Sequence, residues 1–240
     1  MSILLHLNNN ILRVDRYTDH LIFVKERGEL SLSQLGQRIF SAELDWCDDV
    51  ISTPSEICLC INSRFQEIQL TEITTLPTTT SRQIQAYKLP VYFEEGEDSH
   101  AVMTQLQQHN KSLPLSNHTE FVSYILSLQS TVSMFGFMPG FIYLDGLPPS
   151  FSMPRKAIPA KRVSAGSLAI GGPYIGLYSY PSPGGWHIIG RSPIKVSIKE
   201  IQNHLTISDS ISLIAIDKKT FQEMDSAGVT FHTYNFPDHA

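Results

Sequence analysis

Glycine and proline crowd into one segment of this chain, and that crowding constrains the fold more than any other feature. Residues 136–193 hold ten of the 14 glycines and nine of the 14 prolines in the 240-residue sequence. Glycine adopts backbone conformations that other residues resist, and proline fixes φ, so this density predicts tight turns between short strands. Many short strands joined by such turns favour a compact β-barrel in the second half of the chain.

The same segment concentrates positive charge on an acidic protein. It has a charge balance of +4, whereas the whole chain carries −5. A cationic, aromatic and turn-rich surface indicates a place where an anion is held, and a solvated basic face is the alternative. The charged residues of the segment are Arg155, Lys156, Lys161, Arg162 and Arg191, against Asp145 alone.

Composition argues against several classes of protein. A pI near 6.0 argues against non-specific nucleic-acid binding. No apolar run reaches the length of a membrane span, and the first ten residues lack the features of a signal peptide, so we expect no membrane contact and a cytoplasmic location. Cys47, Cys58 and Cys60 are expected to be reduced and buried as small apolar side chains.

Familiar catalytic motifs are also missing. The nine histidines are scattered without metal-ligand spacing, so we expect no metal site within this chain. The sequence contains neither GxxxxGK[ST] nor GxGxxG, which argues against a self-sufficient nucleotide site. A G-x-S-x-G nucleophile elbow is absent as well.

A Thr/Pro/Ser-rich stretch at 74–83 has the composition of a linker and predicts two domains, 1–83 and 84–240. The first domain reads as β-β-α-β-β with a further weak helix, which suggests a sheet with helices on one face. Its expected strands lie at 11–14, 20–25, 50–52 and 56–61, and its expected helices at 32–44 and 64–72.

The second domain reads as mostly short strands. Met103, Leu106 and Gln107 suggest one helix, and Asn117 followed by Glu120 gives a capping-box-like start to a second. Its expected strands lie at 84–93, 131–137, 166–171, 175–179, 186–190, 195–198 and 212–216.

Long motifs in the Gly/Pro-rich segment resemble a known family. They are GFMPGFIYL at 136–144, PR at 154–155, RVSAGSLAIGG at 162–172 and PSPGGWHIIGRSP at 181–193. The chain resembles the B-type subunit of bacterial 5-oxoprolinase, a family that also includes proteins named allophanate hydrolase subunit 1 and Kip-type histidine kinase inhibitors. The match is dense over 136–193 and looser before it, at 17–19 and 50–62.

The resemblance implies an α+β protein with an N-terminal ferredoxin-like α/β sandwich and a C-terminal cyclophilin-like β-barrel. Family members work with a homologous C-type subunit and a third subunit to open 5-oxoproline to glutamate, with ATP bound through the complex. The same two modules, fused, form the carboxyltransferase part of urea carboxylase. We therefore expect one subunit of an ATP-dependent amidohydrolase, inactive alone. A regulator of a sensor histidine kinase and a carboxyltransferase-like component acting on a urea-type substrate stay open.

Two departures from the family pattern bear on the substrate. Pro173 and Tyr174 replace a usual Gln-Thr pair, which removes two polar groups that could bind an amide. Residues 94–98 read EEGED where the family has a glycine-rich stretch. The sequence therefore leaves the exact substrate open.

The candidate site residues come from these motifs. Arg191 is the first choice for holding a carboxylate, and His187 is a candidate general acid or base, so both are candidate catalytic residues. The alternatives are a structural ion pair or loop contact for Arg191 and a surface position for His187. The candidate substrate-binding residues are Tyr143, Arg155, Arg162, Trp186 and Arg191, although Trp186 could belong to the core and the arginines to a solvated face. Together the GFxPGF and PGGWxxIGR motifs predict one anion-accepting pocket.

Overall fold

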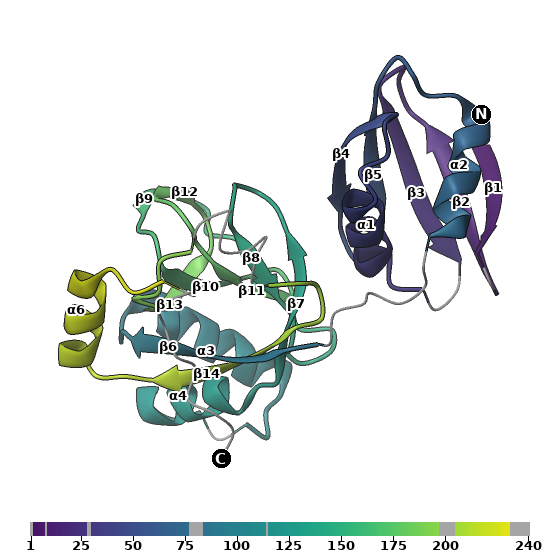
Figure 1. The fold of residues 1–240 in the computed structure, drawn as a ribbon. Coiled ribbons are helices and arrows are strands. Elements are labelled where there is room, and N and C mark those ends of the chain that lie inside the picture. Colours follow the sequence, from purple (N-terminus) through teal and green to yellow (C-terminus); the bar gives the residue numbers. More distant parts are fainter. Residues whose placement is uncertain are drawn as a thin grey trace. The chain divides into compact units, whose positions relative to one another are not determined.

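The structure is a computed structural model that describes residues 2–7, 9–27, 30–76, 84–113, 115–196 and 205–230. The chain divides into two compact units, Met1–Gln83 and Ile84–Ala240. The protein is of the α+β class, because one unit is built on an open sheet and the other on a closed barrel (Figure 1).

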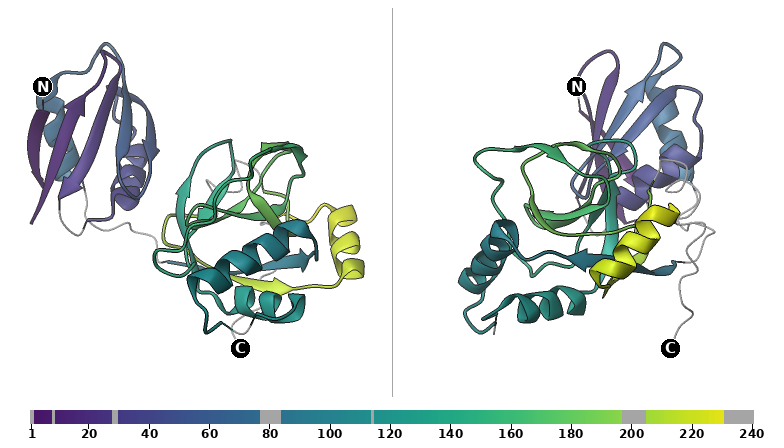
Figure 2. Two further views of the ribbon diagram at one scale, coloured as in Figure 1. Left: turned by 180° about the vertical axis from the view of Figure 1, so that it is seen from behind. Right: turned by 90° about the vertical axis from the view of Figure 1, so that its left-hand side faces the viewer.

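The first unit is a five-stranded antiparallel sheet with strand order β1-β2-β3-β5-β4. Two α-helices, α1 and α2, lie on the same face of this sheet (Figures 1 and 2). The elements are β1 (Ser2–Leu7), β2 (Asn10–Arg16), β3 (Leu21–Arg27), α1 (Leu32–Ser41), β4 (Cys47–Ser52), β5 (Ile57–Ile61), the short 3₁₀ helix η1 (Glu67–Gln69) and α2 (Leu70–Thr75).

The helices of this unit follow from capping and periodicity. The Ser31 side chain accepts a hydrogen bond from Gln34 N and starts α1, as the sequence suggests. Leu35 and Ile39 then recur at helical spacing and are buried against the alternating inward residues of β2, β3 and β5. The expected arrangement of a sheet with its helices on one face is present.

Strand β1 was not among the sequence-based predictions. It forms the edge of the sheet, where Leu5 and Leu7 are buried, Ile3 is half buried, and residues 2, 4 and 6 are exposed. Short apolar runs of this kind do not distinguish a strand from other structures by pattern alone. Its antiparallel pairing with β2, in which Leu5 lies opposite Leu12, identifies the segment as a strand.

The second unit is built on a closed barrel with strand order β10-β11-β8-β7-β14-β6-β13, and β9 and β12 form a separate two-stranded antiparallel sheet. Helices α3 and α4 pack on one side of the barrel, and α6 lies against β6 (Figure 2). The strands are β6 (Ala86–Phe93), β7 (Ser130–Phe135), β8 (Ile142–Leu144), β9 (Ala160–Val163), β10 (Ser167–Gly171), β11 (Tyr174–Leu177), β12 (Ser182–Gly184), β13 (His187–Arg191) and β14 (Ser210–Ala215), and the helices are α3 (Glu97–His109), α4 (His118–Ser127) and α6 (Lys218–Ala227).

Long-range contacts close the barrel. Strands β6 and β14 pair in parallel although more than a hundred residues separate them. The fully buried Asp209 carboxylate accepts hydrogen bonds from Gln85 N and Thr206 N, each at 2.8 Å, and so joins the start of β6 to the turn before β14. A buried carboxylate is stable only when such donors satisfy it.

Most expected elements of this unit are present within a few residues of their predicted bounds, including the helix that Asn117 caps through Glu120 N. Helix α6 was not predicted. Of the expected strand at 195–198, Lys195 forms an isolated bridge with Thr230, and 197–198 lie outside the described residues.

Cys47, Cys58 and Cys60 are free thiols, half buried rather than fully buried. Across the described ranges, every helix is too short or too polar to cross a bilayer.

Candidate functional site

An aromatic pocket lies where the two predicted motifs meet. Its cavity volume is about 110 Å³, and turns and strand ends of the barrel unit form its walls. The first motif supplies three aromatic rings, the second supplies Trp186 and its two preceding glycines, and the loop after β8 supplies one cation. The lining residues are Phe137, Phe141, Tyr143, Arg155, Tyr178, Gly184, Gly185 and Trp186.

Phe141 organises the aromatic walls. Its ring is buried and lies 4.7 Å from the ring of Tyr143, 5.0 Å from Tyr178 and 5.8 Å from Trp186, between centroids. Tilted and edge-to-face pairs at these distances are the favourable arrangements for aromatic rings. The rings therefore hold one another, and the pocket is formed before any ligand arrives.

Phe137 forms the exposed rim of this pocket. Its backbone has φ +65°, a left-handed conformation that is strained for a bulky residue, and its side chain is 65% exposed. Strained backbone of this kind persists only where surrounding contacts hold it, and it is common at ligand sites. Here the turn from Gly136 to Phe141 holds it, through hydrogen bonds from Met138 N to Gly136 O and from Phe141 N to Met138 O.

Arg155 is the cation of the pocket. Its side chain is exposed, and no carboxylate of the described residues pairs with it. Burial raises the pKa of Tyr143, and the charge of Arg155 partly offsets that rise. Burial and the neighbouring Tyr143 raise the pKa of Tyr178, which Arg155 again opposes. One guanidinium and two protonated phenols thus face the same space, a set of donors suited to a carboxylate or another small anion.

The structure places Arg191 outside the lining of this pocket. This residue ends β13. Its Nε donates a hydrogen bond to Ala165 O at 3.2 Å, and its guanidinium lies over the ring of Phe221, 5.3 Å from the centroid. These contacts are the structural alternative that the sequence left open, since they attach β13 to a loop and to helix α6. Arg155 occupies the position expected of Arg191.

His187 is not among the residues that line the pocket. It is the first residue of β13 and follows the bend at Trp186. Its Nε2 lies 3.1 Å from Pro154 O, and its Nδ1 lies 3.6 Å from Asp98 Oδ1, beyond hydrogen-bond distance. With one ring nitrogen on a backbone carbonyl and only 12% of its side chain exposed, His187 is not positioned to exchange a proton with a ligand in the pocket.

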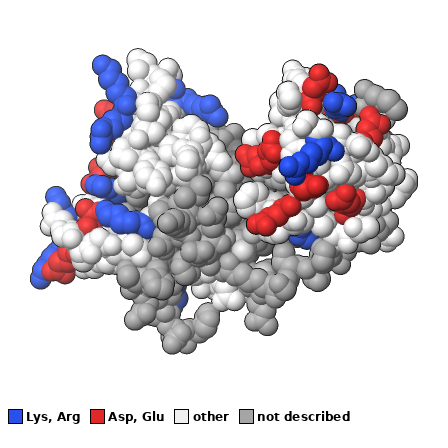
Figure 3. All heavy atoms as spheres, turned by 45° about the horizontal axis from the view of Figure 1, so that its top comes forward, with Lys and Arg blue, Asp and Glu red and all other residues white. Residues whose placement is uncertain are grey.

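Of the other candidate residues, some line the pocket and some do not. Tyr143 and Trp186 line the pocket, with ring centroids 5.6 Å apart. Arg162 is exposed on β9 and does not line it. Tyr174, which with Pro173 departs from the family pattern, has its ring centroid 5.7 Å from that of Tyr143 and does not line the pocket. On the face drawn in Figure 3, Lys and Arg side chains stand at the margin of the barrel unit.

Sequence reasoning missed Asp98 and gave Lys156 no role of its own. The Lys156 ammonium pairs with Asp98 Oδ2 at 2.5 Å, and the same oxygen accepts from Ile188 N at 2.9 Å. Asp98 lies in the 94–98 stretch that departs from the family pattern, and 58 residues separate it from Lys156. Nothing local in the sequence signals a contact over that separation.

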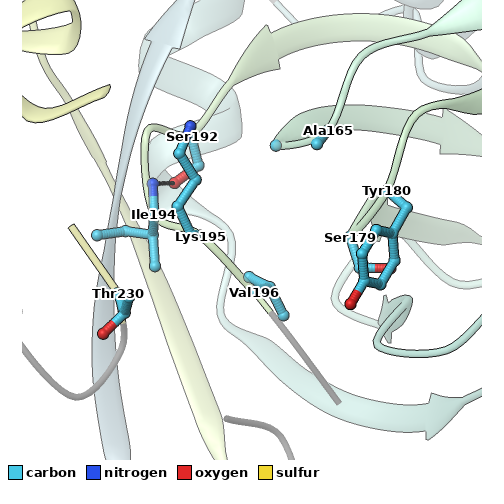
Figure 4. A pocket seen from close by; sticks show the side chains of 9 residues that line it. Ala165, Ser179, Tyr180, Ser192, Ile194, Lys195, Val196 and Thr230 are labelled. Atoms are coloured by element: carbon cyan, nitrogen blue, oxygen red, sulfur yellow. Dashed lines mark hydrogen bonds between the residues drawn. The ribbon is translucent and has the colours of Figure 1, made fainter. Parts of the chain in front are cut away.

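A second, larger cavity of about 270 Å³ lies beside Gly166 and Ser192 (Figure 4). Among the described residues that line it, the charged one is Lys195, which is already paired with Asp225. Its other lining groups are small or aliphatic apart from three hydroxyl side chains and Tyr180. We therefore place the candidate site in the smaller aromatic pocket, where charge and rings converge.

Across the described residues, no group of three or more His, Cys, Asp or Glu side chains is arranged to hold a metal ion.

The fold and the pocket together define a two-unit α+β protein with an aromatic, cation-bearing site on its barrel. The chain belongs to the family described as carboxyltransferase domain, subdomain C and D, which matches residues 50–203. It is 53% identical over 60 residues to the B-type subunit of 5-oxoprolinase from Haemophilus influenzae, an alignment that covers 25% of this chain and 28% of that protein. It is 34% identical over 93 residues to the B-type subunit of 5-oxoprolinase from Bacillus subtilis, covering 38% of each chain. The alignments thus span about a third of the length of these curated relatives.

Solved structures share the fold. The crystal structure of TTHA0988 aligns with a TM-score of 0.61 at 23% identity, over 82% of this chain and 40% of that chain. The urea carboxylase of Kluyveromyces lactis aligns with a TM-score of 0.61 at 14% identity, over 95% of this chain and 24% of that one. At these identities the likeness concerns the fold alone.

Proposed function

We propose that this chain is the B-type subunit of an ATP-dependent 5-oxoprolinase, a complex that opens 5-oxoproline to glutamate. The names of the curated relatives support this function. The observation that carries it in this chain is the unpaired guanidinium of Arg155 among the rings of the aromatic pocket. The substrate is a small flat ring with one carboxylate, so it needs apolar walls and one cation.

In this scheme the pocket binds and orients the substrate. Arg155 pairs with the carboxylate, the hydroxyls of Tyr143 and Tyr178 donate hydrogen bonds to it, and Trp186 covers the lactam ring. The amide oxygen takes the terminal phosphoryl group of ATP, which leaves as ADP. A first water then attacks the activated carbon, and the ring C–N bond breaks to leave an acyl phosphate. A second water hydrolyses this acyl phosphate to glutamate and free phosphate. Preorganised positive charge stabilises the anions that form in both steps.

The partners follow from what the pocket lacks. Among the described residues, its lining includes neither a carboxylate nor a histidine that could act as a general base. We propose that a homologous C-type subunit and a third subunit supply the acid–base groups and the ATP site, and that this chain alone is inactive. The ferredoxin-like identity of residues 1–83 belongs to the same proposal, and the arrangement of β3, α1 and β4, with β5 paired between the two strands, supports it.

Reconstitution tests the proposal directly. The chain is co-expressed with its C-type homologue and the third subunit, and glutamate release from 5-oxoproline is measured with and without ATP. We expect ATP-dependent release from the complex and none from this chain alone. Release by the chain alone at an enzymatic rate, or an assembled complex that forms no glutamate, would contradict it.

A binding measurement on this chain isolates the role of the pocket. Trp186 lines the site, whereas Trp46, the other tryptophan, is fully buried in the first unit. We expect 5-oxoproline to change Trp186 fluorescence saturably, and 2-pyrrolidinone, the same lactam without the carboxylate, to bind much more weakly. Arg155→Met should raise the Kd for 5-oxoproline at least tenfold, since losing a carboxylate clamp costs roughly 2–4 kcal/mol.

A carboxyltransferase-like component acting on a urea-type substrate is the second candidate. The family description and the fold shared with urea carboxylase favour it. Urea has no carboxylate, so this function predicts that Arg155 binds a carboxylated intermediate rather than the free substrate. An adjacent biotin carboxylase gene would favour this candidate, an adjacent gene for a C-type homologue the first, and an adjacent sensor kinase gene a regulatory role.

A further inference from the structure

We propose that Asp98, Lys156 and His187 form a positioning network that holds Arg155 at the aromatic pocket. These three residues lie outside the pocket, and none of them lines it. The anion affinity of the pocket then depends on an ion pair behind its wall. The identity of the anion as 5-oxoproline rests on the proposed function, whereas the positioning of Arg155 does not.

The segment around Arg155 needs such anchors because it has no regular secondary structure. Met153 forms only an isolated bridge, with two hydrogen bonds of 2.8 Å to Gly172, and the next strand begins at Ala160. On the other side of Arg155, Lys156 N donates to Gly185 O at 2.8 Å. The backbone is therefore fixed immediately before and after Arg155, while the Arg155 side chain stays unpaired.

The network supplies the remaining anchors. His187 Nε2 lies 3.1 Å from Pro154 O, next to Arg155 on its N-terminal side. Lys156, next to it on the C-terminal side, pairs with Asp98 at 2.5 Å. Asp98 in turn accepts from Ile188 N, so that the carboxylate joins the loop to β13. Both neighbours of Arg155 are thus attached to the strand that follows Trp186.

The setting of Asp98 makes this ion pair stronger than an ordinary surface pair. Its side chain is 25% exposed and that of Lys156 is 23% exposed, so solvent screens the two charges only in part. Asp98 also lies in the first turn of α3, where the N-terminus of a helix favours negative charge. The amide of Ile188 and the N-terminus of α3 therefore stabilise this carboxylate in addition to Lys156.

Positioning matters because arginine is long and flexible. An arginine that must be immobilised on binding loses rotamer freedom, and that loss weakens affinity. Fixing the backbone on both sides of Arg155 limits where the guanidinium can go. A Cβ placed on Gly185 would lie 3.9 Å from Arg155 Cβ, so the base of the side chain already lies against the pocket wall.

Quenching of Trp186 by iodide and by acrylamide tests the proposal without a ligand. Iodide is an anion that a nearby guanidinium enriches, whereas acrylamide is neutral, and the fully buried Trp46 gives a constant background. The ratio of the iodide to the acrylamide Stern–Volmer constant therefore measures the cation beside Trp186. We expect Arg155→Met to lower this ratio about two- to threefold, the change that a potential of roughly one kT gives.

The network variants separate positioning from simple charge. Asp98→Asn removes a negative charge, so electrostatics alone would raise the ratio, whereas loss of positioning lowers it toward the value of Arg155→Met. Lys156→Met should also lower the ratio, and Lys156→Arg should restore it because the ion pair can re-form. The matched control is Lys161→Met, an exposed lysine of the same basic segment, which should leave the ratio unchanged.

The outcomes are distinguishable. If Asp98→Asn folds by circular dichroism and keeps or raises the wild-type ratio, whatever Lys156→Met does, the network does not position Arg155 and the proposal is overturned. If the ratio falls in both variants and recovers in Lys156→Arg, the positioning role is supported. A fall in the ratio combined with no response of the wild-type protein to 5-oxoproline would support the network and contradict the proposed substrate.

Discussion

The indole of Trp186 lies directly against the backbone of Gly171, on the neighbouring strand β10. A Cβ added at Gly171 would lie 2.5 Å from Cε2 of Trp186, a distance that real side chains do not reach. Gly176, on β11, meets the same ring, since a Cβ there would lie 2.6 Å from Cζ3 of Trp186 and from Cζ of Phe141. Two glycines of the Gly/Pro-rich segment therefore make room for the aromatic wall of the pocket.

Gly171→Ala should displace Trp186 and distort the pocket. The neighbouring atom is a rigid ring, which cannot yield as the end of a flexible chain would, so the indole must move. We expect a shift in the Trp fluorescence maximum and weaker binding of 5-oxoproline, together with a loss of about 1–3 kcal/mol in the free energy of unfolding. Gly172→Ala is the control for space, because nothing lies within 4 Å of a Cβ there, although its φ of +57° adds backbone strain. Unchanged fluorescence in Gly171→Ala would contradict the close contact.

Arg191→Met should affect stability rather than binding. The substitution removes a hydrogen bond to Ala165 O and a cation–π contact with Phe221, neither of which touches the pocket. We expect a loss of about 1–3 kcal/mol in the free energy of unfolding, with the Kd for 5-oxoproline nearly unchanged. Thermal unfolding and fluorescence titration measure the two quantities, and Arg162→Met serves as an exposed-arginine control for stability. A tenfold weaker affinity for 5-oxoproline at an unchanged melting temperature would show that Arg191 binds the ligand, and would contradict a purely structural role.

The contrast between Arg155 and Arg191 shows how far the sequence predicts this site. Motif composition is enough to bring the GFxPGF and PGGWxxIGR segments together, and Tyr143, Trp186 and Arg155 line the resulting pocket. Motif composition does not reveal which arginine side chain lacks a partner, because Arg191 packs on the ring of Phe221, on a helix 30 residues further along the chain. Local patterns carry no information about such a contact.

Strand alternation does not place His187, because Trp186 lies in a bend and β13 begins only at His187. Local patterns do not reveal Asp98 either, because α3 reaches β13 only through the tertiary packing of the barrel. The fold shows where local patterns succeed and fail: caps and periodicity predicted α1 and α4, whereas the edge strand β1 depends on its pairing with β2.

The two pocket tyrosines, Tyr143 and Tyr178, should ionise at a higher pH than tyrosine in an unfolded chain. Burial raises the pKa of Tyr143 and Tyr178 above the value of 10 that an unfolded chain shows. The folded state therefore favours the protonated phenol, so this contribution to stability is complete below pH 10 and is lost as the pH rises through the raised pKa. Absorbance at 295 nm should show tyrosinate forming at higher pH in the native protein than in urea. Tyr143→Phe should remove part of that difference, and coincident native and denatured titrations would contradict burial of the phenols.

Limited proteolysis should cut the chain between residues 76 and 84 and leave two folded fragments. The contacts fall into two compact units that meet at Gln83 and Ile84, and the Thr/Pro/Ser composition around 77–83 is typical of a linker. Each unit has its own apolar core, centred on Trp46 in the first and on the barrel interior in the second. We expect mass spectrometry to find both fragments early in digestion, and the fragment from residue 84 onward to retain the Trp186 response to 5-oxoproline. First cuts within β6 or β5, or a barrel fragment that loses its near-UV circular dichroism, would show that the two units depend on each other for folding.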